Sequence, residues 1–407
     1  MANILTTRAA ANFSANREEL SFAEGIALLD PNENPFTLVT QKVKKKTAGT
    51  IKHSWYTDVL VPETDTVDTS TECTTTGTTL FVDHADRFAI GDVVMRNSTR
   101  EVFLVSTVDV SAGSLVIVRD YGSTSGAYTP VAGTFTDEET ITILSNAFEA
   151  GHALPVEKST TEVEMNNYCQ DIRTPFGITE VAAAAAVRGE ADWPYQMRKA
   201  GITHQRKIEY QFIWGRPMPG DKGLSSSGTG NTDPATMGGL WHFLTGGTVF
   251  SGTGSDRLVS QAEVTKSEFL DWLEAGFEFG SSKKLLLAPP LLRTAIDSWG
   301  IADLQTTPGA NVYGLALSKW LSSHGTISIV THKMLADSSG AAAFLVDLED
   351  LAFVNYSNIG STRLRTLDPY KATGKTIKQA EFETICCLEL KQPKKHAALY
   401  GMTSFAA

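Results

Sequence analysis

Short runs of β-branched residues dominate the chain between residues 51 and 143. The stretch Ile51–Val61 alternates apolar and polar side chains, as a half-buried strand does. Between residues 80 and 143, runs such as Val102–Val108 are separated by Gly, Asn, Ser and Asp. Turn residues between short β-branched runs are typical of a small sandwich or barrel. The pattern therefore predicts one strand at 51–61 and a separate all-β module over 80–143.

Helical patterns appear only after residue 175. Thr179 opens an Ala-rich stretch that ends near Gly189. Asp192 is suited to cap a second helix, with Pro194 in the first turn, where the missing N–H does no harm. This helix is predicted to end at Trp214, which makes it roughly 20 residues and ~30 Å long. It is the longest helix that the sequence predicts.

The C-terminal half mixes both kinds of pattern. Thr265 and Glu268 form a capping box that opens a helix, and residues 291–299 predict another. Strand-like runs lie at Lys284–Ala288, Ile327–Val330, Ala343–Val346, Glu381–Leu390 and Ala397–Gly401. Because these strands and helices do not alternate as regular βαβ units, the sequence predicts an α+β fold and not a doubly wound enzyme.

Residues 1–48 have the character of an arm. They contain a short amphipathic piece at 19–29, followed by Asp30-Pro31 and by the run 32–35, which ends in another proline and is expected to interrupt any helix. The segment is too poor in large apolar residues to build its own core. We therefore expect it to lie on its own subunit or on a neighbouring one.

Composition limits the classes of function. The chain has 407 residues and a formal net charge of −11, so a nucleic-acid-binding surface that covers the whole molecule is excluded. A local basic run remains, in which the cations are Lys42, Lys44, Lys45 and Lys46. It is either a solvated face, a contact to a neighbour's acidic edge such as Glu138 and Glu139, or a surface that faces nucleic acid. The N-terminus lacks a secretory pattern and no apolar run is long enough to span a membrane, so we expect a protein made in the cytoplasm.

No constellation for catalysis stands out. The sequence has no Gly-x-Ser-x-Gly elbow, no His-Glu-x-x-His and no CxxC pair. Its four cysteines, Cys73, Cys169, Cys386 and Cys387, are expected to be buried thiols. Acidic clusters at 137–139 and 347–350 are interpreted as solvated turns or ion pairs between subunits. We predict that the protein is not an enzyme and needs no cofactor or metal.

The order of these parts resembles the major capsid proteins of tailed bacteriophages, of the Hong Kong 97 (HK97) type. The runs Phe88–Val94, Glu101–Val105 and Leu115–Arg119 are similar to a β insertion that is common in those proteins. The resemblance implies an N-arm, an E-loop that carries the inserted β-domain, a peripheral (P) domain with a long spine helix, and an axial (A) domain. The implied boundaries are 1–48 for the arm, 49–79 and 144–160 for the E-loop, 80–143 for the inserted domain, 161–236 and 371–407 for the P domain with its spine helix at 192–214, and 237–370 for the A domain.

The resemblance also implies a function and partners. Such a protein assembles with itself into hexamers and pentamers, which form an icosahedral or prolate head around double-stranded DNA. It works with scaffold, portal and decoration proteins, without a membrane, and is assembled in the host cytoplasm into the virion capsid. Candidate contacts between subunits are Phe36, Trp55, Tyr56, Glu138 and Glu139, although the three aromatic residues could equally pack inside their own subunit.

Three other functions fit the sequence less well. The protein could be a decoration or tail component, the shell protein of an encapsulin-like nanocompartment, or a hydrolase with the β module as a binding appendage. The long helix and the large α/β end argue against a decoration or tail component. A recognisable group of catalytic residues would favour the hydrolase, and we identify no such group in the sequence.

Overall fold

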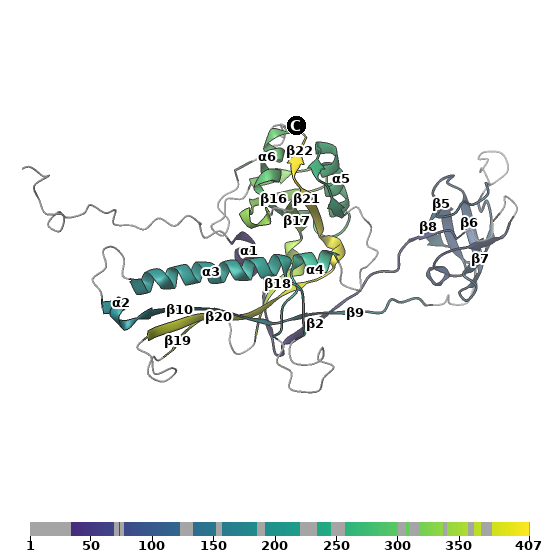
Figure 1. The fold of residues 1–407 in the computed structure, drawn as a ribbon. Helices are drawn as coiled ribbons and strands as arrows, with labels where there is room; N and C mark the ends of the chain where they lie inside the picture. Colours follow the sequence, from purple (N-terminus) through teal and green to yellow (C-terminus); the bar gives the residue numbers. More distant parts are fainter. Residues whose placement is uncertain are drawn as a thin grey trace, which may run out of the picture. The chain divides into compact units, whose positions relative to one another are not determined.

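The computed structural model divides the chain into two compact units, residues 1–55 with 165–407, and residues 56–164 (Figure 1). The structure describes residues 34–68, 73, 77–122, 133–151, 157–184, 192–219, 234–245, 257–299, 307–308, 318–336, 340–356, 362–367 and 377–406. The amphipathic piece expected at 19–29 lies outside these residues. None of the described helices is long and apolar enough to cross a membrane.

A five-stranded sheet forms the base of the first unit. Its strands are β1 (Lys45–Ala48), β18 (Leu351–Tyr356), β20 (Ile377–Leu390), β10 (Gln170–Thr179) and β19 (Arg363–Leu367). β20 pairs antiparallel with β10 on one side, and with β18 and β19 on the other. β1 is parallel to β18 at the edge. The sheet therefore joins segments from the beginning, middle and end of the chain.

Helix α3 (Asp192–Trp214) lies along β10 and β20, as Figure 1 shows. Its bounds confirm the predicted long helix. Ala200, His204, Ile208 and Phe212 are all buried, and their spacing of four residues places them on one stripe of the helix. The neighbouring elements are α2 (Glu180–Ala184) and α4 (Leu240–Thr245), both of which contact α3.

A seven-stranded sheet forms the rest of the first unit. Its order is β11 (Leu258–Ser260), β21 (Ala397–Met402), β17 (Ala341–Val346), β13 (Lys283–Ala288), β16 (Thr326–Thr331), β15 (Ser318–Leu321) and β14 (Thr307–Pro308). All six residues of β17 are buried. Ala342 and Phe344 contribute to the core that includes α3, whereas Ala343 and Leu345 contribute to the core with α5 (Lys266–Phe277) and α6 (Pro290–Ser298). Burial on both faces explains why β17 is a continuous apolar run.

The C-terminal strands were assigned to the wrong sheet. The resemblance placed 371–407 in the P domain with the spine helix, so residues 380–390 and 396–402 were both expected in the sheet beneath that helix. β21 instead pairs with β17 and β11 in the seven-stranded sheet, whereas β18, which lies within the predicted A domain, joins the five-stranded sheet. A strand's own pattern reports its burial but not its partner, so sequence could not make this choice. A two-residue pair, β12 (Glu263–Val264) with β22 (Ser404–Phe405), completes this end.

The first helix was missed by the sequence analysis. The run that ends in Pro35 was expected to break any helix, yet α1 (Pro35–Val43) begins at that residue. Proline fits the first turn of a helix, because its missing N–H is not needed there. The expectation that helices start after residue 175 is therefore wrong. The predicted Ala-rich helix is present as α2, and the remainder of that prediction lies outside the described residues.

The second unit is an all-β domain with its own core. Its sheet has the order β3 (Thr64–Thr66), β8 (Thr140–Asn146), β5 (Asp92–Arg96), β6 (Val102–Asp109), β7 (Ser114–Val118) and β4 (Thr79–Phe81). A bridge between Val67 and Val82 joins the ends of the two outer strands, so the sheet closes on itself. Its core side chains, which include Phe103 and Phe135, all come from residues 67–141. Two further strands, β2 (Lys52–Thr57) and β9 (Val163–Tyr168), pair with each other.

Four short 3₁₀ helices are also described: η2 (Ala85–Arg87), η4 (Lys333–Leu335), η5 (Leu348–Asp350) and η6 (Pro393–Lys395). The capping box predicted at Thr265 and Glu268 is present at the start of α5. With helices and strands segregated in this way, the predicted α+β class is confirmed.

Candidate functional site

A buried carboxylate fixes the start of the arm helix α1. Glu209 of α3 has no exposed surface and accepts hydrogen bonds from the backbone N–H groups of Phe36 (2.9 Å) and Thr37 (2.7 Å), and from the Thr37 hydroxyl. Asn34, the residue before the helix, makes no capping bond with its side chain. Glu209 therefore takes the place of a local cap, and its negative charge suits the positive end of the helix dipole.

The same carboxylate also binds a residue of the seven-stranded sheet. His332, which directly follows β16, lies with Nε2 2.7 Å from Oε1 of Glu209, and both side chains are completely buried. Glu209 thus joins α1, α3 and the end of β16 at one point. Breaking such a buried pair by removing one partner typically costs about 3–5 kcal/mol.

Phe36 packs inside its own subunit. Its side chain is completely buried, and its ring lies 6.3 Å from that of Phe212, which in turn lies 5.4 Å from Phe353. Val39, one helical turn further on, is buried in the same core. The structure therefore corresponds to the alternative that the sequence left open for Phe36, and the arm from residue 34 onward contributes to the core.

The basic run after α1 divides into paired and exposed residues. Lys46 of β1 and His53 of β2 contact the two carboxylate oxygens of Glu389, at 2.7 and 2.9 Å. Burial of Glu389 would raise its pKa, but the hydrogen bonds from His53 and Lys46 outweigh this and bring the pKa to about 2. Lys46 is therefore an internal partner. The other three lysines, Lys42, Lys44 and Lys45, are exposed.

Trp55 and Tyr56 point to opposite faces of β2, as neighbours in a strand must. Trp55 is 6% exposed and its ring lies 5.9 Å from that of Phe243. Tyr56, by contrast, is 70% exposed. Of the three candidate aromatic contacts, Tyr56 is therefore the one that the folded subunit presents to its surroundings.

The two acidic candidates in the β-domain also differ. Glu139 is buried, and its Oε1 lies 2.5 Å from Nε of Arg96. Two hydrogen bonds join Arg119 to Glu101, each of 2.7 Å, and the guanidinium groups of Arg96 and Arg119 lie over the ring of Phe135, at 4.6 and 4.9 Å from its centre. Glu139 thus belongs to an internal network and is not available as an acidic edge, which corrects that part of the prediction.

Glu138, in contrast, is exposed on a turn with a positive φ of 59°. It remains a candidate for contact with another subunit.

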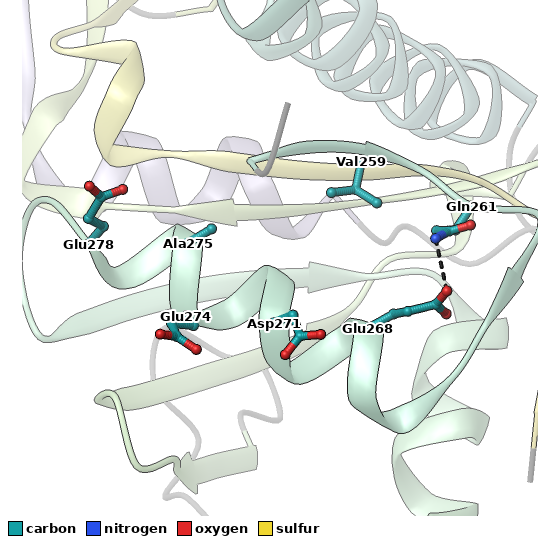
Figure 2. A pocket seen from close by; sticks show the side chains of 7 residues that line it. All are labelled: Val259, Gln261, Glu268, Asp271, Glu274, Ala275 and Glu278. Carbon is teal, nitrogen blue, oxygen red and sulfur yellow. Dashed lines mark hydrogen bonds between the residues drawn. The ribbon is translucent and has the colours of Figure 1, made fainter. Parts of the chain in front are cut away.

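An acidic hollow runs along helix α5 (Figure 2). Its volume is about 510 Å³, and its lining residues are Val259, Gln261, Glu268, Asp271, Glu274, Ala275 and Glu278. The Glu268 carboxylate accepts a hydrogen bond from Gln261 and belongs to the capping box with Thr265. Asp271, Glu274 and Glu278 are exposed. In the described part of the chain, no three His, Cys, Asp or Glu side chains are grouped so that they could hold a metal ion.

Taken together, these groups hold segments of the chain in place. Three of the buried charged groups, Glu209, Glu389 and Arg96, each have an oppositely charged or hydrogen-bonded partner. The four cysteines are buried and free, and Cys169 lies with its sulfur 3.5 Å from that of Cys387. Burial strongly raises the pKa of Cys386 above its ordinary value, so this thiol is kept protonated.

A comparison of the chain with models of protein families identifies the family to which it belongs. The model of the SU10 major capsid protein family matches residues 5–403, nearly the whole chain. The chain belongs to this family. A major capsid protein forms the shell of a virion by assembling with itself, so the prediction of a self-assembling capsid subunit is confirmed.

Several solved capsid structures are similar to this major capsid protein. The capsid of a native GTA particle has 8% identity and a TM-score of 0.47, covering 99% of this chain and 100% of that one. The capsid of Ralstonia phage GP4 has 8% identity and a TM-score of 0.46, with 97% and 98% covered. The encapsulin of Synechococcus elongatus PCC 7942 has 10% identity and a TM-score of 0.42, with 61% and 80% covered. No curated protein matches the sequence. The assignment rests on the family match.

Sequence reasoning missed the anchoring residues of this capsid protein. Glu209 and Glu389 were not singled out, although each carried a signal. Glu209 stands among Ile208, Phe212 and Ile213, and Glu389 lies between two leucines at the end of an apolar strand. A charged residue that interrupts a buried apolar pattern needs a partner. A charged residue inside an apolar pattern is therefore the signal by which Glu209 and Glu389 could have been found from the sequence.

Proposed function

We propose that this protein forms hexamers and pentamers with an HK97-like arrangement, and that these build an icosahedral or prolate head around double-stranded DNA. The observation that carries the proposal is the family match over residues 5–403. In this proposal the protein has no catalytic role, uses no cofactor, and is assembled in the host cytoplasm with scaffold, portal and decoration proteins.

The division into two units supports a role for the β-domain as an insertion. Its core shares no residue with the two cores of the first unit, and its ends enter and leave next to the paired strands β2 and β9. We assign residues 64–146 to the inserted domain, because its sheet extends from β3 to β8 and so beyond the expected bounds 80–143. The flanking residues 49–63 and 147–160 are assigned to the E-loop. Tyr56 and Glu138 are the exposed candidates for contact with a neighbouring subunit, and Lys42, Lys44 and Lys45 for contact with a neighbour or with DNA.

Electron microscopy of the purified, overexpressed protein tests this function. We expect closed shells, or ring-shaped capsomers of five and six subunits, at high protein concentration. A matched pair of variants, Tyr56→Ala and Tyr168→Ala, should separate an assembly contact from a half-buried residue of the strand that pairs with β2. A protein that stays monomeric at every concentration would overturn the proposal.

A further inference from the structure

Between Lys199 and Tyr210, one face of α3 carries three cations and no acid. Because an α-helix turns by about 100° per residue, Lys199, Thr203, Arg206, Lys207 and Tyr210 fall within a sector of about 100°. Four of these side chains are exposed, and Arg206 is half-buried. From Lys199 to Tyr210 the stripe is about 17 Å long, at a rise of about 1.5 Å per residue. We call these five residues the basic stripe.

The acidic residues of α3 both have hydrogen-bond partners, and one shares the face of the stripe: Asp192 lies seven residues, about 10 Å, before Lys199. The helix contains two of them, Asp192 and Glu209. Asp192 is half-buried at the start of the helix and accepts a hydrogen bond of 3.2 Å from Gln196, while Glu209 is buried against α1. The five residues of the stripe themselves include no carboxylate, in a chain with a formal net charge of −11.

Neighbouring elements add little negative charge. The helices α1 and α4 both pack against α3, and neither contains an acidic residue. On α2, Glu180 is exposed, beside the N-terminal part of α3. Asp171 of β10 lies on the strand beneath the helix, but its carboxylate is 2.6 Å from the guanidinium of Arg173. The acids of β20, which also contacts α3, are paired with cations: Glu381 with Arg365, Glu383 with Arg363 and Glu389 with Lys46.

The contacts of the two lysines orient them without cancelling their charge. Lys199 Nζ lies 5.5 Å from the centre of the Tyr195 ring. Lys207 Nζ donates to the backbone carbonyl of Arg173 (3.4 Å) and to the Thr174 hydroxyl (3.3 Å). A carbonyl, a hydroxyl and an aromatic ring carry no net charge, so both ammonium groups can still attract an anion.

We propose that the basic stripe of α3 binds the phosphate backbone of double-stranded DNA. This inference rests on the proposed function, in which the shell encloses DNA. Lysine and arginine bind phosphates through charge, and the hydroxyl of Tyr210 is of the kind that adds a hydrogen bond to a phosphate oxygen. The Thr203 hydroxyl already donates to the backbone carbonyl of Lys199 (3.0 Å). Because no base-reading element accompanies the stripe in the described residues, the binding is independent of sequence.

Salt-dependent DNA binding by the full-length protein tests this inference. The probe is a short mixed-sequence DNA duplex, titrated by fluorescence anisotropy between about 50 and 200 mM NaCl, where each phosphate contact contributes about −0.9 to the slope of log K against log salt concentration. The variant is K199Q/R206Q/K207Q. We expect it to reduce the slope by about 2–3 and to weaken binding at low salt by at least about tenfold.

Two matched variants separate charge at this position from total charge and from misfolding. K266Q/K283Q/K319Q removes three exposed lysines on the seven-stranded-sheet side and should keep the wild-type slope. K199R/R206K/K207R keeps the charge of the stripe and should also keep it. The inference is overturned if the wild type shows no salt-dependent binding, if the control variant loses as much slope as the stripe variant, or if the charge-preserving variant loses it.

Assembly is measured on the same proteins by electron microscopy. If the stripe variant no longer forms shells while the control variant does, the stripe is a contact to a second copy, such as the acidic face of α5, and the inference is overturned. Failure of the wild type to form shells or capsomers tells against the proposed function instead. The two ideas therefore fail on different measurements.

Discussion

Glu209 is the residue whose removal should damage the subunit most. Glu209→Ala leaves His332 and two N–H groups of α1 buried without their acceptor, and should lower the free energy of unfolding by about 3–5 kcal/mol. Glu209→Gln keeps an acceptor oxygen and should cost less, about 1–3 kcal/mol. Urea unfolding of the unassembled subunit measures both. Glu274→Ala, at an exposed position, should change the free energy of unfolding by less than about 0.5 kcal/mol. If Glu209→Ala changes it by as little, the anchoring role of Glu209 is refuted.

A second prediction at the residue scale concerns pH. Burial, together with the nearby charge of Lys207, lowers the pKa of His204 from 6.5 to about 4. The unfolded chain therefore binds a proton at a higher pH than the folded chain, and His204 contributes stability that is complete above pH 6.5 and is lost as the pH falls toward 4. His204→Gln should remove about 1 kcal/mol per pH unit from the slope of unfolding free energy between these limits.

Thermal or urea unfolding at a series of pH values measures this slope. His324→Gln, at an exposed position, is the matched control and should leave the slope unchanged. Glu389, with its pKa lowered from 4.5 to about 2, acts only at the lower end of this window, whereas burial lowers the pKa of His396 to about 4 as well. Both groups are present in the wild type and in the variants, so only the difference between the slopes is assigned to His204. A His204→Gln slope equal to that of the wild type would show that the buried ring is not the source of the acid sensitivity.

At the scale of elements, the capping box of α5 offers a local test. The Thr265 hydroxyl accepts from the Glu268 N–H, and the Glu268 carboxylate accepts from the Thr265 N–H at 2.9 Å. Thr265→Ala should destabilise the subunit by about 1 kcal/mol, the usual value of an N-cap. Ser267→Ala, at an exposed position of the same turn, should have almost no effect. A double variant with Glu268→Ala should lose less than the sum of the two single changes, because both bonds belong to one motif.

Elements that carry their own signals were predicted from the sequence, and those that depend on distant partners were not. α3 was predicted with its bounds because Asp192, Pro194 and the glycine after Trp214 mark its ends locally. α1 was missed because its capping residue, Glu209, lies more than 170 positions away. The basic run shows the same limit for the site: Lys45 and Lys46 are neighbours in sequence, but only Lys46 meets Glu389, 343 positions later. Tertiary pairing of this kind leaves no local pattern.

At the scale of the whole molecule, the separate cores predict separate unfolding. Residues 56–164 contain a closed sheet with thirteen core side chains among the residues that the structure describes, and none of these belongs to the described cores of the first unit. Calorimetry of the unassembled protein should therefore show two transitions. Residues 56–164, expressed by themselves, should unfold cooperatively at the temperature of one of the two. Phe103→Ala removes a completely buried ring and should lower the free energy of unfolding of the β-domain by about 3–5 kcal/mol. The transition of the β-domain should move to a lower temperature, and the other transition should stay in place. Phe212→Ala, the matched change in the first unit, should do the reverse. A single transition that both variants shift together would mean that the β-domain and the rest of the subunit fold as one cooperative body.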